Sequence, residues 1–383
     1  WAPLVVLVAA LVATCNALSS AQLAAAHPRS GGTYEYGYRL LHPMAGFTAG
    51  WMFLCAKSAS AATAALGFAG YLLNLLGVED HRGVVWLGAG IVVVLTALVA
   101  GGLRRSNMVN TVVVSVTVLA LVAFVASGLS RAWPNWGEPP ISSDPSLRTL
   151  LEATALMFVA YTGYGRVATL GEEVRDPART IPRAIVATLY VSAALYLAVA
   201  FVAVNAVGSE AFLAATEGLA APLEVISRSF GWSGIPVFVG LGAVTAMAGV
   251  LLNLLLGLSR VLLAMGRRGD MPSAVTKVDA QRSSPFVAVI VVGAIILSLT
   301  LIGSIRTAWS FSAFTVLVYY ALTNLAALRL PPEQRLYSRA WSIGGLASCA
   351  FLAFWVEPKI WMVGLGLIGV GLIWHFVARN SRS

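Results

Sequence analysis

An apolar helical stretch of this chain contains two glycines at a place where a small solute could bind. It lies within residues 158–185, FVAYTGYGRVATLGEEVRDPARTIPRAI. The segment TGYG at 162–165 puts two glycines into the middle of this stretch, and each glycine costs a helix about 1 kcal/mol relative to alanine. A helix that opens there frees carbonyl and amide groups that hydrocarbon cannot satisfy, so they must face a polar cavity or a ligand. The pattern predicts that freed peptide groups bind a polar guest. The alternative is close helix packing at Gly163 and Gly165, because small residues let helices approach.

A block of charge and proline follows the two glycines. Residues 172–177, EEVRDP, carry too much charge to remain in hydrocarbon and mark the arrival at a membrane surface. We expect Pro177 to end the first helix, Thr180 to cap the next one, and Pro182 to lie in its first turn.

Three charged residues of this region could form an inner gate by pairing with one another, namely Glu172, Arg175 and Arg183. Exposed ion pairs usually contribute little, so ordinary solvated loop charge is the alternative. The spacing of these residues leaves both interpretations open.

Lys57 stands alone inside another apolar stretch. It lies about 14 residues past Pro43, roughly 20 Å along a helix, which places it near the middle of a membrane span. Intramembrane lysines are costly and usually functional or paired, yet no carboxylate stands at a comparable depth in any predicted span. One functional hypothesis is that Lys57 binds a proton. The alternative is that its ammonium donates to carbonyls of the opened helix or snorkels along a cavity.

The elements that position these residues must be membrane helices. Apolar residues make up 58% of the 383 residues and charged ones only 11%, too few charges to cover a soluble surface of this size. The apolar stretches lack the alternation of barrel strands, and open backbone cannot sit in lipid, so each stretch is predicted to be a helix. Eleven stretches are long enough to span a bilayer: 4–26, 44–77, 84–102, 108–128, 150–170, 181–206, 235–265, 285–304, 307–328, 338–356 and 358–377.

The basic charge of the chain follows from its membrane orientation. The formal net charge is +9, and most of the 25 lysines and arginines fall on one side of the predicted spans. That excess marks the cytoplasmic side, so no nucleic-acid partner is needed to explain the charge. With this orientation the first span runs inward, and we expect a further helix upstream of Trp1 to complete a set of twelve.

The loops are short, so residues 1–383 form a single transmembrane domain. Two amphipathic segments, at 31–51 and 215–236, each precede an unusually long span. They lie five spans apart on opposite faces, as an inverted repeat of five plus five helices requires.

The remaining reactive side chains indicate no enzyme chemistry. Three cysteines are scattered at spacings that suit neither disulfides nor a metal site, and packing is their expected role. Four histidines lie in loops and at a helix end without a metal cluster or a catalytic triad. We therefore expect no enzyme activity, no metal and no cofactor.

The whole pattern resembles the amino acid-polyamine-organocation (APC) superfamily, specifically its amino acid permeases. The resemblance rests on PRSGGTYEYGYRLLHPMAGFTAGW at 28–51, on the segment 158–185, and on SRVLLAMGRRGDMP at 259–272 followed by SSP at 283–285. It implies an all-α polytopic membrane protein: a leucine-transporter-type bundle of five-plus-five inverted repeats with two extra C-terminal helices. Eleven of its twelve transmembrane helices are then present.

The resemblance also implies where a substrate binds. The substrate amino group would be held by backbone carbonyls near Phe158, Val159, Ala160 and Tyr161, with Gly163 letting the chain turn and the Tyr161 ring acting as a gate. The substrate carboxylate would rest on a glycine-rich first helix, which matches nothing in this chain. We expect no transport unless that helix is present.

These observations predict a secondary active transporter, a permease that moves amino acids or related amines by alternating access and couples them to protons, for instance by symport. We expect it to be a multi-pass protein of the plasma membrane whose partners are the amino acid, protons and lipid. A transporter-like amino acid sensor, or an exchanger without net flux, is the alternative. Which amino acid is carried, proton versus sodium coupling, and the oligomeric state are left open by the residues.

Overall fold

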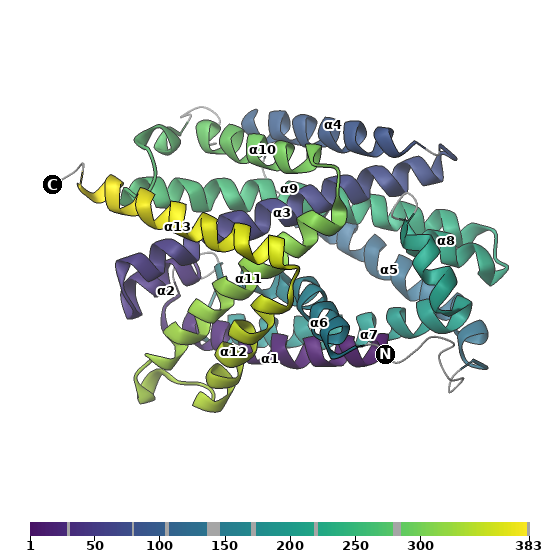
Figure 1. Cartoon of the computed structure of the whole chain (residues 1–383), viewed down its shortest axis with the longest axis horizontal. Helices are drawn as coiled ribbons and strands as arrows, with labels where there is room; N and C mark the ends of the chain where they lie inside the picture. The colour runs from purple at the N-terminus through teal and green to yellow at the C-terminus, as the bar shows by residue number, and fades with distance from the viewer. Residues whose placement is uncertain are drawn as a thin grey trace.

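The computed structural model describes residues 1–28, 31–78, 80–103, 107–135, 146–169, 174–217, 221–278 and 285–380. Within these ranges the chain forms α-helices joined by short 3₁₀ segments, with no β-strand (Figure 1). The α-helices are α1 (Ala2–Ala26), α2 (Thr33–Leu40), α3 (Pro43–Leu75), α4 (His81–Ala100), α5 (Asn107–Ala132), α6 (Leu147–Tyr161), α7 (Pro177–Glu217), α8 (Pro222–Ser227), α9 (Gly234–Arg268), α10 (Phe286–Leu301), α11 (Ile305–Leu328), α12 (Arg339–Leu352) and α13 (Pro358–Asn380). The prediction of an all-α fold is confirmed.

Eight helices of the described part are long and apolar enough to cross a membrane: α1, α3, α4, α5, α7, α9, α11 and α13. Helix α10 is apolar but shorter. Helices α6 and α12 are shorter still, and each continues into a 3₁₀ segment, η1 (Thr162–Thr169) and η5 (Ala353–Trp355). Each of the eleven predicted stretches therefore overlaps one of these helices. Three of the helices, α6, α10 and α12, are shorter than a full span.

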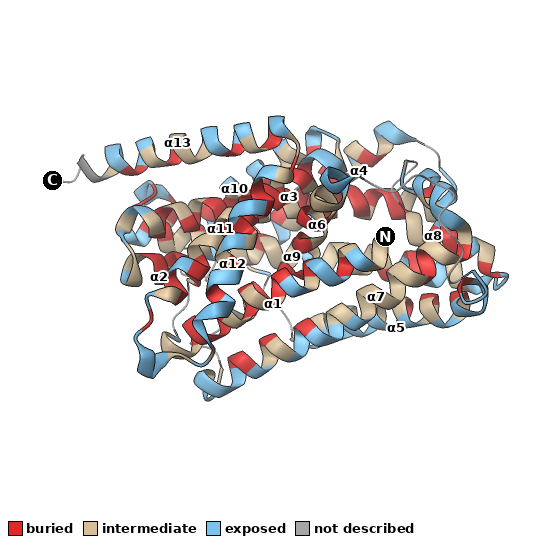
Figure 2. Ribbon diagram, turned by 60° about the horizontal axis from the view of Figure 1, so that its bottom comes forward, coloured by how far each residue is buried: buried red, intermediate tan, exposed pale blue. Residues whose placement is uncertain are grey.

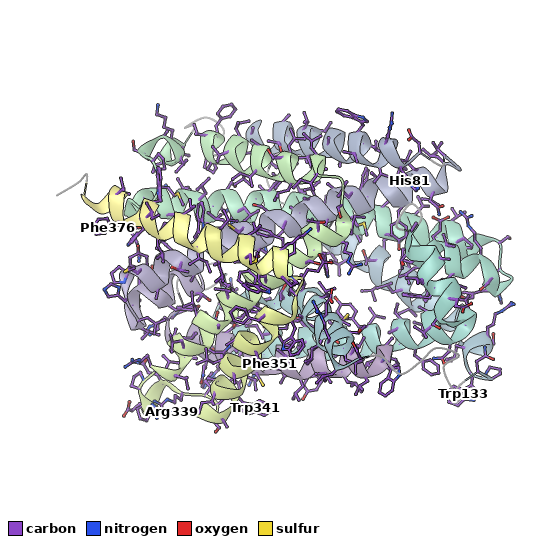
Figure 3. All side chains as sticks on the ribbon, in the orientation of Figure 1. His81, Trp133, Arg339, Trp341, Phe351 and Phe376 are labelled. Atoms are coloured by element: carbon purple, nitrogen blue, oxygen red, sulfur yellow. The ribbon has the colours of Figure 1, made fainter. Side chains whose placement is uncertain are left out.

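The outside of the bundle is apolar. Figure 2 shows exposed positions along most of α13, whereas α3 at the centre is mostly buried. Large side chains such as Trp341, Phe351 and Phe376 are exposed; Figure 3 labels all three. An apolar outer surface on helices of this length is the surface that lipid covers.

The helices pair in the way that an inverted repeat requires. Helix α1 packs against α7, α3 against α9, and α4 against α10, and each pair joins spans that are five apart in the chain. The amphipathic helices α2 and α8, which precede α3 and α9, lie at opposite ends of the bundle (Figure 1). The two segments that the sequence singled out as counterparts thus occupy related places on opposite membrane faces.

Helix α3 joins the two largest apolar clusters of the core. One cluster gathers residues mainly of α1, α6, α7, α11 and α12, and the other gathers residues mainly of α4, α9 and α10, while α3 contributes buried residues to both. Trp51 and Phe53 of α3 pack against both clusters. Lys57 follows Phe53 by one turn on α3, so it projects from the helix that joins the two apolar clusters.

The start of α7 corrects one prediction. The helix begins at Pro177, not after Thr180, and Thr180 lies in its first turn with its hydroxyl donating to the carbonyl of Arg175 at 3.0 Å. Proline is well suited to a first helical position because its fixed φ matches the helix and its missing N–H is not needed there. Pro177 therefore starts α7 instead of only ending the preceding segment.

Candidate functional site

The α-helix breaks where the sequence predicted it. Helix α6 ends at Tyr161, and η1 continues as a 3₁₀ helix from Thr162. The amide of Thr162 donates to the carbonyl of Val159, three residues back, whereas an α-helical amide would donate to Phe158, four residues back. The Phe158 carbonyl therefore does not receive the hydrogen bond that the Thr162 amide would donate to it in an α-helix.

Side chains from neighbouring helices cover other carbonyls of the break. Tyr196 of α7 donates its hydroxyl to the carbonyl of Ala160 at 3.1 Å. Trp309 of α11 donates its indole N–H to the carbonyl of Leu156 at 3.0 Å, and Tyr320 of α11 donates to that of Thr162 at 3.4 Å. The sequence interpretation missed these three aromatic residues. Their signal was present, because a buried Tyr or Trp inside an apolar span needs a partner for its polar group.

Tyr161, the predicted gate residue, is buried at the end of α6. Its hydroxyl donates to the carbonyl of Val6 on α1 at 3.2 Å, and its ring lies edge-to-face on Tyr196 with centroids 5.1 Å apart. In this conformation Tyr161 bridges the broken helix to α1 and α7. The role of the ring as a gate stays a prediction.

The two glycines of TGYG differ in their surroundings. A Cβ built on Gly165 would lie 2.5 Å from the Tyr320 hydroxyl, whereas one built on Gly163 meets no atom within 4 Å. Neither glycine has a positive φ. At Gly165 the small size of the residue is therefore what matters, and at Gly163 the helix faces open space.

Lys57 is linked directly to this break. Its Nζ donates to the Thr162 hydroxyl at 2.9 Å, and that hydroxyl donates to the carbonyl of Val159 at 2.7 Å. Among the residues that the structure describes, no carboxylate forms an ion pair with Lys57. The three groups form one hydrogen-bonded chain from α3 to the end of α6.

Arg166 fixes the far side of the 3₁₀ segment. Its guanidinium donates to the carbonyl of Asn253, in the middle of α9. Its position only five residues beyond Tyr161, in a stretch still apolar on both sides, was the available signal for such a role. Both members of the central pair α3 and α9 therefore hold the broken helix.

The described structure holds only two residues of the predicted inner gate, Arg175 and Arg183, so the gate stays a prediction. Arg175 and Arg183 are exposed, and no ion pair of either is present among the described residues. Glu172 lies outside the described residues. The nearest ion pair of the described loop joins Asp176 to Arg179 at 4.0 Å, and both of its side chains are exposed.

A second polar cluster lies at the end of the bundle that carries α2. The buried carboxylate of Asp270 accepts from the Tyr34 hydroxyl at 2.6 Å and from the Tyr38 hydroxyl at 2.7 Å. Trp374 of α13 donates to the backbone carbonyl of Asp270 at 2.8 Å. Burial, followed by the hydrogen bond to Asp270, raises the pKa of Tyr34, so this hydroxyl remains a donor. The cluster joins α2, the end of α9 and α13.

An all-helical bundle with paired inverted helices and a broken helix between them defines a class, the polytopic membrane transporters of the inverted-repeat type. Comparison with known proteins gives the family. The chain belongs to the amino acid permease family, whose sequence model matches residues 2–378. It is therefore a permease and an integral membrane protein.

Individual relatives agree with this assignment. The chain is 39% identical over 372 residues to an uncharacterized transporter of Mycobacterium tuberculosis, across 97% of this chain and 82% of the relative. It is 27% identical over 403 residues to the branched-chain amino acid permease BcaP of Bacillus subtilis, across 98% and 85%. It is 28% identical over 353 residues to cationic amino acid transporter 4 of Mus musculus, across 86% of this chain and 55% of the relative.

Proposed function

We propose that this permease moves amino acids or related amines across the plasma membrane by alternating access, coupled to protons. The observation that carries the proposal is the change of register at Thr162, because it leaves the Phe158 carbonyl without its helical donor. A carbonyl in that state is an acceptor for a substrate ammonium group. The names of the relatives, a branched-chain amino acid permease and a cationic amino acid transporter, support amino acids as the substrate class.

The substrate site consists of the backbone from Phe158 to Tyr161, with Gly163 at its open side. The Phe158 carbonyl binds the amino group. The Val159 carbonyl already accepts both the amide and the hydroxyl of Thr162, whereas the Ala160 carbonyl accepts the Tyr196 hydroxyl and has a second lone pair for a ligand. Tyr161 releases its bond to Val6 when it closes over the substrate.

The coupling proton is carried by Lys57, and the inner gate is formed by Glu172, Arg175 and Arg183. The hydrogen bond from Lys57 to Thr162 supports the role of Lys57 as the proton carrier. Through this bond, the protonation of Lys57 and the conformation of the broken helix depend on each other. Loss of the proton would leave Thr162 without its ammonium donor, which favours a different arrangement of the break.

Uptake by the intact protein in proteoliposomes tests the function. Labelled amino acids should accumulate when the outside is made acidic, and Lys57→Gln should abolish the effect of the pH gradient. Lys359→Gln is the matched control, because Lys359 is an exposed lysine at the start of α13. Saturable binding without any flux would instead identify a sensor, and equal uptake with and without a gradient in both proteins would refute proton coupling by Lys57.

A further inference from the structure

The charge of Lys57 is not balanced by the protein in the described structure. The carboxylates that do form ion pairs lie toward the ends of the helices: Glu35 with Arg39 and Arg268, Glu224 with Arg228, Glu152 and Glu357 with Arg306, Asp176 with Arg179, and Asp270 beside His375. Within the described ranges, the one hydrogen-bond partner of Lys57 is the neutral hydroxyl of Thr162. A half-buried ammonium inside a membrane span is costly in this state unless a counter-ion joins it.

The ammonium is also held at the site where the substrate is proposed to bind. Thr162 accepts from Lys57 and donates to the Val159 carbonyl, so one hydroxyl separates the Lys57 nitrogen from the carbonyls of the break. Thr162 is only 2% exposed, and Phe53, one turn earlier on α3, packs against both apolar clusters. The Lys57 ammonium is therefore held at the break and does not extend to the membrane surface.

We propose that Lys57 selects substrates by charge, so that the site accepts amino acids with neutral or acidic side chains and excludes those with a cationic side chain. The inference rests on the proposed function and names its substrate class. The α-amino group of any amino acid already brings one positive charge to the Phe158 carbonyl. A second cation on the substrate would face the Lys57 ammonium with no protein carboxylate of the described residues to offset it, whereas a substrate carboxylate supplies the missing counter-charge.

Charge–charge interactions of this kind are large enough to decide specificity. At an effective dielectric constant of about 20, two unit charges roughly 8 Å apart change an affinity by more than about tenfold. Discrimination through an unbalanced charge works mainly by repulsion of the wrong ligand. The selectivity should therefore depend on the charge of residue 57 and not on its size.

Competition among matched amino acids tests the proposal. The intact protein is reconstituted with equal pH on both sides and the membrane potential set to zero, so that a driving force does not favour one charge. Lysine is compared with norleucine, which has the same length without the ammonium, and glutamate is compared with glutamine. The variants are Lys57→Gln, Lys57→Met and the charge-preserving Lys57→Arg, with Lys359→Gln as the control on an exposed lysine.

In the wild-type protein, lysine should compete about tenfold or more weakly than norleucine, and glutamate at least as well as glutamine. Lys57→Gln and Lys57→Met should reduce the lysine–norleucine difference to less than about threefold and weaken glutamate relative to glutamine. Lys57→Arg and Lys359→Gln should retain the wild-type ratios. If the wild-type protein takes up neutral amino acids, and the Lys57→Gln and Lys57→Met variants both keep the wild-type preference between charged and neutral substrates, only this inference is overturned. If the wild type takes up no amino acid, the proposed function and the inference both fail.

Discussion

His375 on α13 lies with its Nδ1 3.2 Å from the Oδ1 of Asp270, which stands two residues beyond the end of α9. Both side chains are buried, and the ring of Phe47 on α3 stacks on His375 with centroids 4.7 Å apart. The same carboxylate accepts from Tyr34 and Tyr38. Asp270 therefore holds three separate parts of the chain at one end of the bundle.

Asp270→Ala should destabilise the protein strongly. The change removes the acceptor of the buried Tyr34 hydroxyl, and an unsatisfied buried polar group costs about 1–3 kcal/mol. The melting temperature of the purified protein in detergent measures the effect. Glu333→Ala, which alters an exposed carboxylate in the loop after α11, is the control and should change the melting temperature little. Equal melting temperatures for the two variants would contradict the structural role of Asp270.

Thr162→Val should impair transport more than Thr162→Ser. Valine has nearly the shape of threonine but removes both the acceptor for Lys57 and the donor to Val159, whereas serine keeps the hydroxyl. Loss of a hydrogen bond to a charged group costs about 1.5–3 kcal/mol, so initial uptake rates should fall about tenfold or more in the valine variant. Rates within about twofold for both variants would show that the hydroxyl does not link Lys57 to the break.

Gly165→Ala and Gly163→Ala should differ, although the two residues are only two positions apart. The added methyl at residue 165 would lie 2.5 Å from the Tyr320 hydroxyl and must displace a buried side chain, at a cost of about 1–3 kcal/mol. The methyl at residue 163 meets open space, so it should leave the melting temperature close to that of the wild type. Melting curves of the pair check this. A larger loss of stability for Gly163→Ala would contradict the packing described for the break.

Stability at alkaline pH should depend on Tyr34. Burial and the bond to Asp270 raise the pKa of this residue above its unfolded value of about 10, so its contribution is complete below about pH 10 and is lost as the pH rises further. Tyr34→Phe removes that titration. The variant should be less stable near neutral pH but should lose less stability than the wild type between about pH 9 and about pH 11. Parallel pH profiles of the two melting temperatures would rule out this linkage.

Much of the helical framework could be predicted from the sequence because its signals are local. Apolar runs of bilayer length must become helices, and the glycines of TGYG weaken one helix at Thr162, where α6 does end. The two amphipathic segments pointed to counterpart spans, and α3 does pack against α9. The start of α7 was misplaced by one turn because proline can either end a helix or begin one.

The partners of the broken helix were decided by the tertiary structure. The sequence placed Lys57 near the middle of a span and left two roles open, but Thr162 is 105 residues away, and only the packing of α3 beside the end of α6 brings the two together. Likewise, Tyr196 of α7 and both Trp309 and Tyr320 of α11 donate to carbonyls at or near the break. Hydropathy and helix propensity act over a few turns of one helix, so they determine where a helix spans and breaks. Which side chain then satisfies a freed peptide group depends on the rotation and contacts of helices far apart in the chain, and those follow from packing the whole bundle.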